Sequence, residues 1–186
     1  LAFINYGGIQ AIQTLWAGPW MLNITGYTPL QSATGLFWIN ITMLISYFIW
    51  GYILPKISEY GISSIKLIKL GLPISYFSLF LIIYFGNNAG AFLFTLYIMT
   101  SIVISLTQPA IALNFSKNLA GKSLTSYNVF LFSGTFFIQW GIGLVIDLCN
   151  NKGFDIVSSY RISFSVFLIL CVLSYIFFIY LNKNEN

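Results

Sequence analysis

Long apolar stretches, separated by short segments that contain glycine, proline or polar residues, dominate the pattern of this sequence. A helix needs roughly 20 apolar residues to cross the hydrocarbon core of a bilayer. Windows of that length predict six membrane-spanning helices, at about residues 1–21, 33–54, 67–85, 90–113, 127–148 and 160–181. The connections between them are short, so we expect antiparallel neighbours packed as one bundle in a single domain, residues 1–186.

Composition excludes a soluble fold. Hydrophobic residues make up 58% of the chain and charged residues only 6%, whereas a soluble domain has roughly 25% charged residues. In lipid, backbone polar groups must be bonded within helices or within a closed barrel. A barrel would show stretches of about 10 residues in which apolar and polar positions alternate, but runs such as 77–85 and 166–181 are uninterrupted. We therefore expect an all-α membrane protein.

The lysine and arginine residues predict the orientation, because positive residues concentrate on the cytoplasmic side. With the N-terminus inside, the opposite side holds only Lys152 and Arg161. The cytoplasmic segments then hold Lys56, Lys66, Lys69, Lys117, Lys122 and Lys183. We therefore expect both termini in the cytoplasm.

Patterns that would indicate catalysis or metal binding are missing from the sequence. It has no histidine, and Cys149 and Cys171 fit neither a disulfide framework nor a metal-ligand spacing. No glycine-rich phosphate loop follows a strand, and the lysines never form a run of like charge. We expect no enzymatic activity, no cofactor, no metal and no nucleic-acid partner.

Uncharged polar side chains at membrane depth form the candidate substrate site, because such groups are costly in lipid and usually face a bundle interior or a watery cavity. In the first window, residues at helical spacing predict one shared face, made of Tyr6, Gln10, Gln13 and Trp20. In the fifth window the same argument groups Asn128, Thr135, Gln139 and Asp147. Asn40 and Gln108 complete the set of candidate substrate-binding residues. Hydrogen bonding between helices, without any ligand, is the alternative interpretation for each.

Two features of the fifth window have more than one interpretation. Gly134, Gly141 and Gly143 mark a face that allows close helix approach, either for packing alone or beside a substrate. Asp147 is an acid near the predicted external end, so it serves either an interfacial, structural role or a proton relay.

Several segments resemble the second half of bacterial transporters of the major facilitator superfamily. The stretch L-W-A-G-P-W at 15–20, followed by N-I-T-G-Y-T at 23–28, is similar to their seventh transmembrane helix and its following loop. F-F-I-Q-W-G-I-G-L-V-I-D at 136–147 resembles their eleventh helix, after a cytoplasmic loop N-L-A-G-K-S-L-T-S-Y-N at 118–128. A loop motif of the family is matched by Gly51, Lys56 and Gly61, but Pro55 stands where an Asp is expected, which leaves gating through this motif in doubt.

This resemblance implies half of a major facilitator fold, with six helices arranged as two inverted three-helix repeats. The family holds a small solute between two such halves near the midplane and exposes it alternately to each side. By that likeness the chain needs an N-terminal six-helix half, lies in a bacterial inner membrane, and uses Gln10, Gln13 and Gln139 for substrate contact. The interior amides and aromatic rings suit a neutral, zwitterionic or aromatic-bearing solute.

Two rival interpretations stay open. The first is a small hydrophobic subunit of a membrane-bound respiratory complex, although the mid-membrane acids or lysines of proton-translocating subunits are missing from the sequence. The second is a complete six-helix protein that works as a homodimer. Because the first residue is Leu1 and not Met, we expect a fragment of a longer chain.

Overall fold

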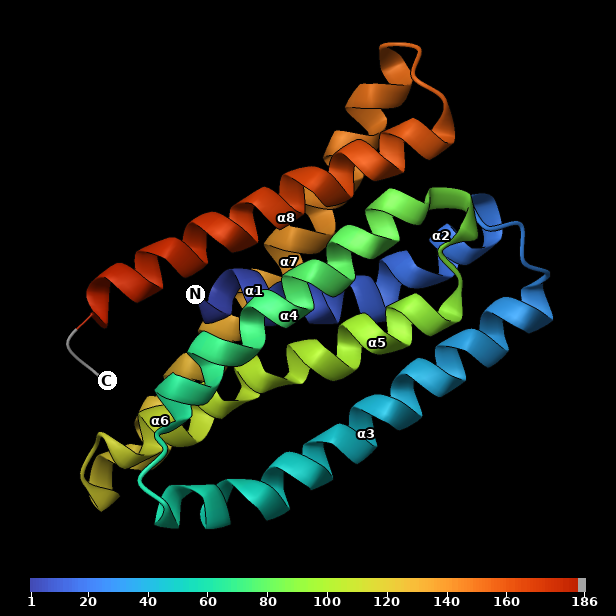
Figure 1. The fold of residues 1–186 in the computed structure, drawn as a ribbon. Helices are drawn as coiled ribbons and strands as arrows, with labels where there is room; N and C mark the ends of the chain where they lie inside the picture. The colour runs from blue at the N-terminus through green and yellow to red at the C-terminus, as the bar shows by residue number, and fades with distance from the viewer. Residues whose placement is uncertain (184–186) are drawn as a thin grey trace.

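The computed structural model describes residues 1–183, apart from the side chain of Lys117, and these residues are helical along most of their length (Figure 1). No strand occurs in them. The elements are α1 (Ala2–Ala11), η1 (Ile12–Trp16), α2 (Ala17–Asn23), α3 (Pro29–Glu59), α4 (Ser64–Phe85), η2 (Gly86–Asn88), α5 (Ala91–Ser101), η3 (Ile102–Leu106), α6 (Thr107–Leu113), α7 (Lys117–Asn151) and α8 (Ile156–Leu181).

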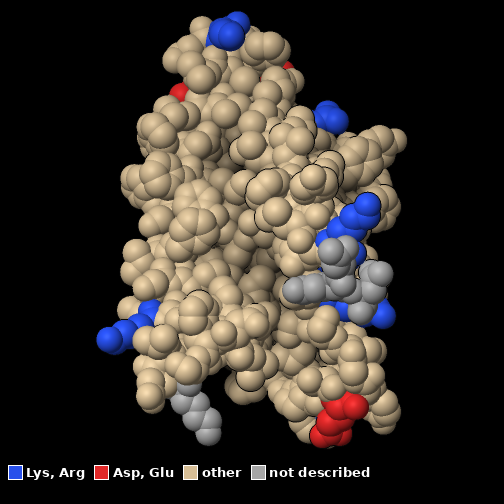
Figure 2. Space-filling view, turned by 90° about the vertical axis from the view of Figure 1, so that its left-hand side faces the viewer, with Lys and Arg blue, Asp and Glu red and all other residues tan. Residues whose placement is uncertain are grey.

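These elements join into six helical rods, because α1, η1 and α2 follow one another without a break, as do α5, η3 and α6. Five of the rods are long and apolar enough to cross a membrane. The first rod carries more polar residues and is not one of these five, although it lies among the others (Figure 1). Figure 2 shows a face of the molecule that is largely uncharged, with its charged side chains toward the margins. The expectation of an all-α chain with several helices long and apolar enough to cross a membrane is confirmed.

Helix α3 is longer at both ends than the window at 33–54. It begins at Pro29 because Thr28 and Gln31 form a reciprocal capping box, in which each side chain accepts a hydrogen bond from the other residue's backbone N–H. The expected end of this helix at about residue 54 is wrong, because α3 continues through Pro55 to Glu59. Proline removes one backbone hydrogen bond, and helices in a membrane tolerate that loss where neighbours compensate.

The segment 118–128, which we expected to be a cytoplasmic loop, is helical and belongs to α7. It contains no proline and one glycine, Gly121. A single glycine weakens a helix by only about 1 kcal/mol relative to alanine, so nothing local forces a break within this segment. The expectation of a loop followed the family likeness and is wrong for this chain.

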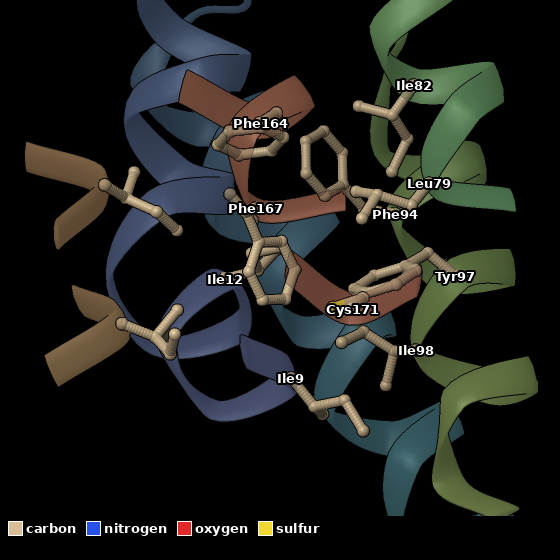
Figure 3. Close-up of a cluster of buried hydrophobic side chains, with 14 of the residues drawn as sticks. Ile9, Ile12, Leu79, Ile82, Phe94, Tyr97, Ile98, Phe164, Phe167 and Cys171 are labelled. Atoms are coloured by element: carbon tan, nitrogen blue, oxygen red, sulfur yellow. The ribbon is translucent and has the colours of Figure 1, made fainter. Parts of the chain in front are cut away.

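Residues from rods that are distant in sequence meet in one apolar core. Helix α1 packs on α7, α5 packs on α3, and α4 packs on both α5 and α8. Figure 3 shows side chains of α1, η1, α4, α5 and α8 directed toward one another, among them Ile9, Ile12, Leu79, Ile82, Phe94, Tyr97, Ile98, Phe164, Phe167 and Cys171.

Glycines allow the closest helix crossing, between α1 and α7. A Cβ atom placed on Gly134 would lie 2.2 Å from the backbone oxygen of Phe3, and one on Gly7 would lie 2.6 Å from the backbone carbon of Gly134. Small residues let backbones approach in this way in lipid. Of the other two glycines on the predicted α7 face, Gly143 faces Trp16, and Gly141 has open space beside it.

Taken in chain order, the first three and the last three rods make two sets of three, and each set begins with an interrupted rod. The first and fourth rods are the interrupted ones, and 90 positions separate both Ile12 from Ile102 and Trp16 from Leu106. The interruption is a π-helical turn in the first rod and a 3₁₀ segment in the fourth. The second and fifth rods, α3 and α7, are the two longest helices.

Candidate functional site

Hydrogen-bonded amide and hydroxyl side chains connect the first rod to α3 on one side and to α7 on the other. We call this group the polar seam. Its members are Tyr6, Gln10, Gln13, Thr14, Asn40, Tyr47 and Gln139.

The contact with α3 has two parts. Gln13 donates a hydrogen bond from Nε2 to Oδ1 of Asn40, and Asn40 in turn donates to the carbonyl oxygen of Leu36, one turn earlier, at 2.7 Å. Toward the start of the rod, Gln10 donates to the hydroxyl of Tyr6 at 3.3 Å, and the Tyr6 side chain lies close to that of Tyr47 on α3. Both tyrosine and amide groups therefore span the same interface.

The contact with α7 is made by Gln139. Its Nε2 donates to Thr14 Oγ1 at 2.8 Å, and its backbone carbonyl accepts a hydrogen bond from Trp16 Nε1 at 3.2 Å. Thr14 also donates to the carbonyl oxygen of Gln10 at 2.6 Å. The side chain and the backbone of Gln139 are thus both held by the first rod.

The π-helical turn Ile12–Trp16 carries both contacts of the first rod. A π-turn holds more residues than an α-turn, so the side chains after it are shifted around the rod from the positions that the 3.6-residue period would give. Gln13 turns to α3 and the next residue, Thr14, turns to α7. Turns of this kind occur frequently at functional sites.

The polar seam reaches the surface and has unused hydrogen-bonding capacity. Thr14 and Asn40 are exposed, whereas Gln10, Gln13 and Gln139 are half-buried. The Gln13 Oε1 atom is buried and accepts no hydrogen bond from the described residues. The seam contains amides and hydroxyls but no charged side chain. It is therefore suited to hydrogen bonding with an uncharged or zwitterionic molecule.

Trp20 lies away from the polar seam. It is fully buried, and its ring centroid is 4.8 Å from that of Phe164 and 5.9 Å from that of Phe94. The single face that we expected for the first window assumed an unbroken 3.6-residue period, and the π-turn between Gln13 and Trp20 changes that period. Trp20 therefore points into the aromatic core of the bundle.

Two other candidate residues are not joined to the polar seam by hydrogen bonds among the described residues. Asn128 is exposed on α7, about 16 Å along the helix axis from Gln139 at the usual rise per residue. Gln108 is half-buried on α6. Near it, Thr107 and Tyr127 form a separate hydroxyl pair at 2.5 Å that joins α6 to α7.

Sequence reasoning missed Thr14 and Tyr47, which become seam members only through the π-turn and the packing of α3. It also missed Asn5, which is buried and links three rods. Asn5 donates to Ser174 Oγ at 3.1 Å and accepts from the Tyr76 hydroxyl at 2.9 Å. An asparagine in an apolar helix was the available signal, but its partners lie on α4 and α8, far away in sequence.

Comparison with protein-family models, with curated proteins and with solved structures finds no match to this chain. Within residues 1–183, no group of three or more His, Cys, Asp or Glu side chains is placed to hold a metal ion. The polar seam is thus the candidate site that the geometry itself offers.

Proposed function

We propose that this chain is the C-terminal six-helix half of a secondary transporter of the major facilitator type, which moves a small uncharged or zwitterionic solute by alternating access. The observation that carries the proposal is the polar seam, in which three rods direct amides and hydroxyls to one face at membrane depth.

The cost of polar groups in hydrocarbon supports a covered or water-filled seam. Polar side chains within membrane spans almost always face a bundle interior or an aqueous cavity. Asn40 and Thr14 are exposed in this chain, so a cavity or a second protein surface must cover them. A second six-helix half, closing over this face, would provide both.

The spacing and packing of the interrupted rods support the proposal further. The second rod of each set packs on the first rod of the other set, as α7 does on α1 and α3 does on α5. The interrupted first and fourth rods have their irregular turns 90 positions apart, at Ile12 and Ile102. Transporters built from inverted repeats commonly place discontinuous helices beside the substrate near the bilayer midplane.

The proposal includes the orientation and the location in the cell. The ends of α3 and α8 and the starts of α4 and α7 carry most of the lysines, and the positive-inside rule places that end in the cytoplasm. Both termini are then cytoplasmic, in the inner membrane of a bacterium.

Thiol labelling in sealed vesicles tests the proposal without knowledge of the solute. In a background in which Cys149 and Cys171 are replaced by alanine, single cysteines are introduced by Gln13→Cys and Gln139→Cys. A membrane-impermeant maleimide reacts with thiolates, which form only where water reaches the sulfur. We expect both seam cysteines to be labelled when the protein is assembled with its other half.

The matched control is Ile169→Cys on α8, a position that is 57% exposed on an apolar stretch. This cysteine should stay unlabelled because hydrocarbon surrounds it. If none of the three cysteines were labelled, water would not reach the seam, and this result would contradict a transport pathway.

A further inference from the structure

A second feature of the molecule is a large cavity beside α3, with a volume of about 640 Å³. Its walls come from α3, from α4, and from α5 with η3. Side chains such as Ile49, Leu70, Ile74 and Met99 make the lining almost entirely apolar. All three walls belong to helices that are long and apolar enough to cross a membrane, so hydrocarbon is expected to surround the cavity.

The cavity is separate from the polar seam. On α3, the seam residue Asn40 comes two positions before the cavity residue Thr42. The seam residue Tyr47 likewise comes two positions before the cavity residue Ile49. Two residues correspond to about 200° around an α-helix. The seam and the cavity therefore lie on opposite sides of α3, and the cavity does not depend on the proposed transport function.

Few polar groups line the cavity, and two of its hydroxyls bond to their own helix. The Ser46 hydroxyl donates to the carbonyl oxygen of Thr42 at 2.8 Å, and the Thr100 hydroxyl donates to the carbonyl oxygen of Leu96 at 2.9 Å. Such bonds to a residue's own helix leave little to recognise a polar solute. The cavity instead suits a flexible hydrocarbon chain that lies along the helices, and the span from Thr42 to Trp50 gives it a length of about 12 Å.

One end of the cavity lies at the basic end of the molecule. Leu67 lines the cavity, and the preceding residue, Lys66, is exposed in the first turn of α4. Lys56 is also exposed, six residues after the lining residue Trp50. Glu59 is the one acid on α3 and α4, so this end keeps a net positive charge. Basic pockets between membrane helices attract anionic lipid headgroups.

We propose that this cavity is a binding site for an anionic phospholipid, with one acyl chain between α3 and α4 and the phosphate group near Lys56 and Lys66. The apolar walls select a chain, and the two lysines select a negative headgroup. A zwitterionic phospholipid with the same chains would make the same contact with the apolar walls, but it would be attracted less strongly by the two lysines.

Native mass spectrometry of the purified protein tests this site. The protein in detergent is incubated with phosphatidylglycerol or phosphatidylcholine of identical acyl chains, and the retained lipid is measured. We expect the protein to retain phosphatidylglycerol in preference. Lys66→Gln should lower that preference about fivefold, as the loss of one lysine near a headgroup predicts. Thr42→Phe, which narrows the cavity, should reduce retention of both lipids.

The matched control is Lys122→Gln, because Lys122 is exposed on α7 at the same end of the molecule but away from the cavity. It should leave the preference unchanged. Circular dichroism checks that the Thr42→Phe variant is folded, and Lys66→Gln, on the surface, tests the site independently. Equal retention of the two lipids by the unchanged protein, or an equal effect of Lys66→Gln and Lys122→Gln, would overturn the proposal.

Discussion

The two long helices α3 and α7 occupy corresponding places in the two three-rod sets, yet they are held differently. In its most apolar stretch α7 has 28% of its residues buried and α3 only 11%. The crevice between α7 and α8 is about 190 Å³, whereas the cavity between α3 and α4 is about 640 Å³. Both helices are strongly apolar, with mean hydropathy of 1.9 and 1.5 in these stretches.

The difference shows that apolar character does not decide how tightly a helix packs in a membrane. Lipid tails are as apolar as a leucine side chain, so close approach depends on small residues. Helix α7 meets α1 at Gly134 and Gly7, where the backbones nearly touch. On α3, Gly35 meets side chains and not a backbone, since an added Cβ would lie 2.8 Å from the Cβ of Ala91, and Gly51 has open space beside it. Substitutions at these glycines test the contrast directly.

Substitution of the crossing glycine should have the largest effect. In Gly134→Ala the new Cβ would lie 2.2 Å from the backbone oxygen of Phe3, which forces the two helices apart. We expect the free energy of unfolding to fall by about 3 kcal/mol, at the upper end of what overpacking usually costs. Denaturant unfolding in mixed micelles, followed by circular dichroism, measures it.

Two variants serve as controls for this prediction. Gly141→Ala lies on the same helix and Gly51→Ala on its counterpart, and an added Cβ meets no atom within 4 Å at either position. Both variants should be as stable as the unchanged protein or slightly more stable, since alanine favours a helix. If Gly134→Ala behaved like them, the close crossing of α1 and α7 would be refuted.

Loss of the buried amide of Asn5 should have the next largest effect. Asn5→Ala leaves the Tyr76 hydroxyl without its acceptor at a buried place, so we expect a loss of about 1–2 kcal/mol in unfolding free energy. A double-mutant cycle with Tyr76→Phe measures the coupling. The two changes together should cost less than the sum of their separate effects. Strict additivity would mean that the pair does not interact.

Removal of a seam hydrogen bond should affect stability less. Gln139→Leu loses the bond to Thr14, and hydrogen bonds between membrane helices average about 0.6 kcal/mol. We expect a loss of that size in the same unfolding experiment, with Gln108→Leu as the unchanged control. If the proposed function is right, solute uptake by the assembled transporter falls far more than this small loss explains. Normal uptake would separate the seam from transport.

The smallest effect concerns the caps of the third rod in each set. Asp155 caps α8 and accepts a hydrogen bond from the Ser158 backbone N–H at 3.1 Å, whereas the uncharged Ser63 caps α4. The side chain and backbone of Ser158 lower the pKa of the Asp155 carboxyl. A lowered pKa stabilises the folded state above the ordinary pKa of aspartic acid, and this contribution is lost as the pH falls through the folded value.

Acid should therefore weaken the start of α8 and leave the start of α4 unchanged. Hydrogen-exchange protection of the Ser158 amide, compared between pH 6 and about pH 2.5, should decrease more than that of the Lys66 amide. Asp155→Asn keeps the cap without the titration and should remove the difference. An equal pH response of both helix starts would contradict a role for Asp155.

Much of the fold was predictable because membrane-spanning helices follow from local hydropathy. Each expected window corresponds to a helical rod, but the ends differed, since capping at Thr28 and the continuation through Pro55 depend on a few atoms. The segment 118–128 shows the limit of a family likeness, because its helical conformation follows from the absence of any strong local break.

The candidate site was predictable only in part. Gln10, Gln13 and Gln139 were named from polarity at membrane depth, which is visible in the sequence. Their partners were not, because Asn40 and Thr14 meet them through helix packing and through the π-turn. That turn also places Trp20 in the core.

The sequence by itself determined the medium and the secondary structure of this protein, because hydropathy and backbone hydrogen bonding act over one helix at a time. Only the tertiary structure decided which helices touch, where the seam and the lipid-sized cavity lie, and which polar groups pair. Those outcomes depend on contacts between rods, such as Gly7 with Gly134, that no single stretch of sequence contains.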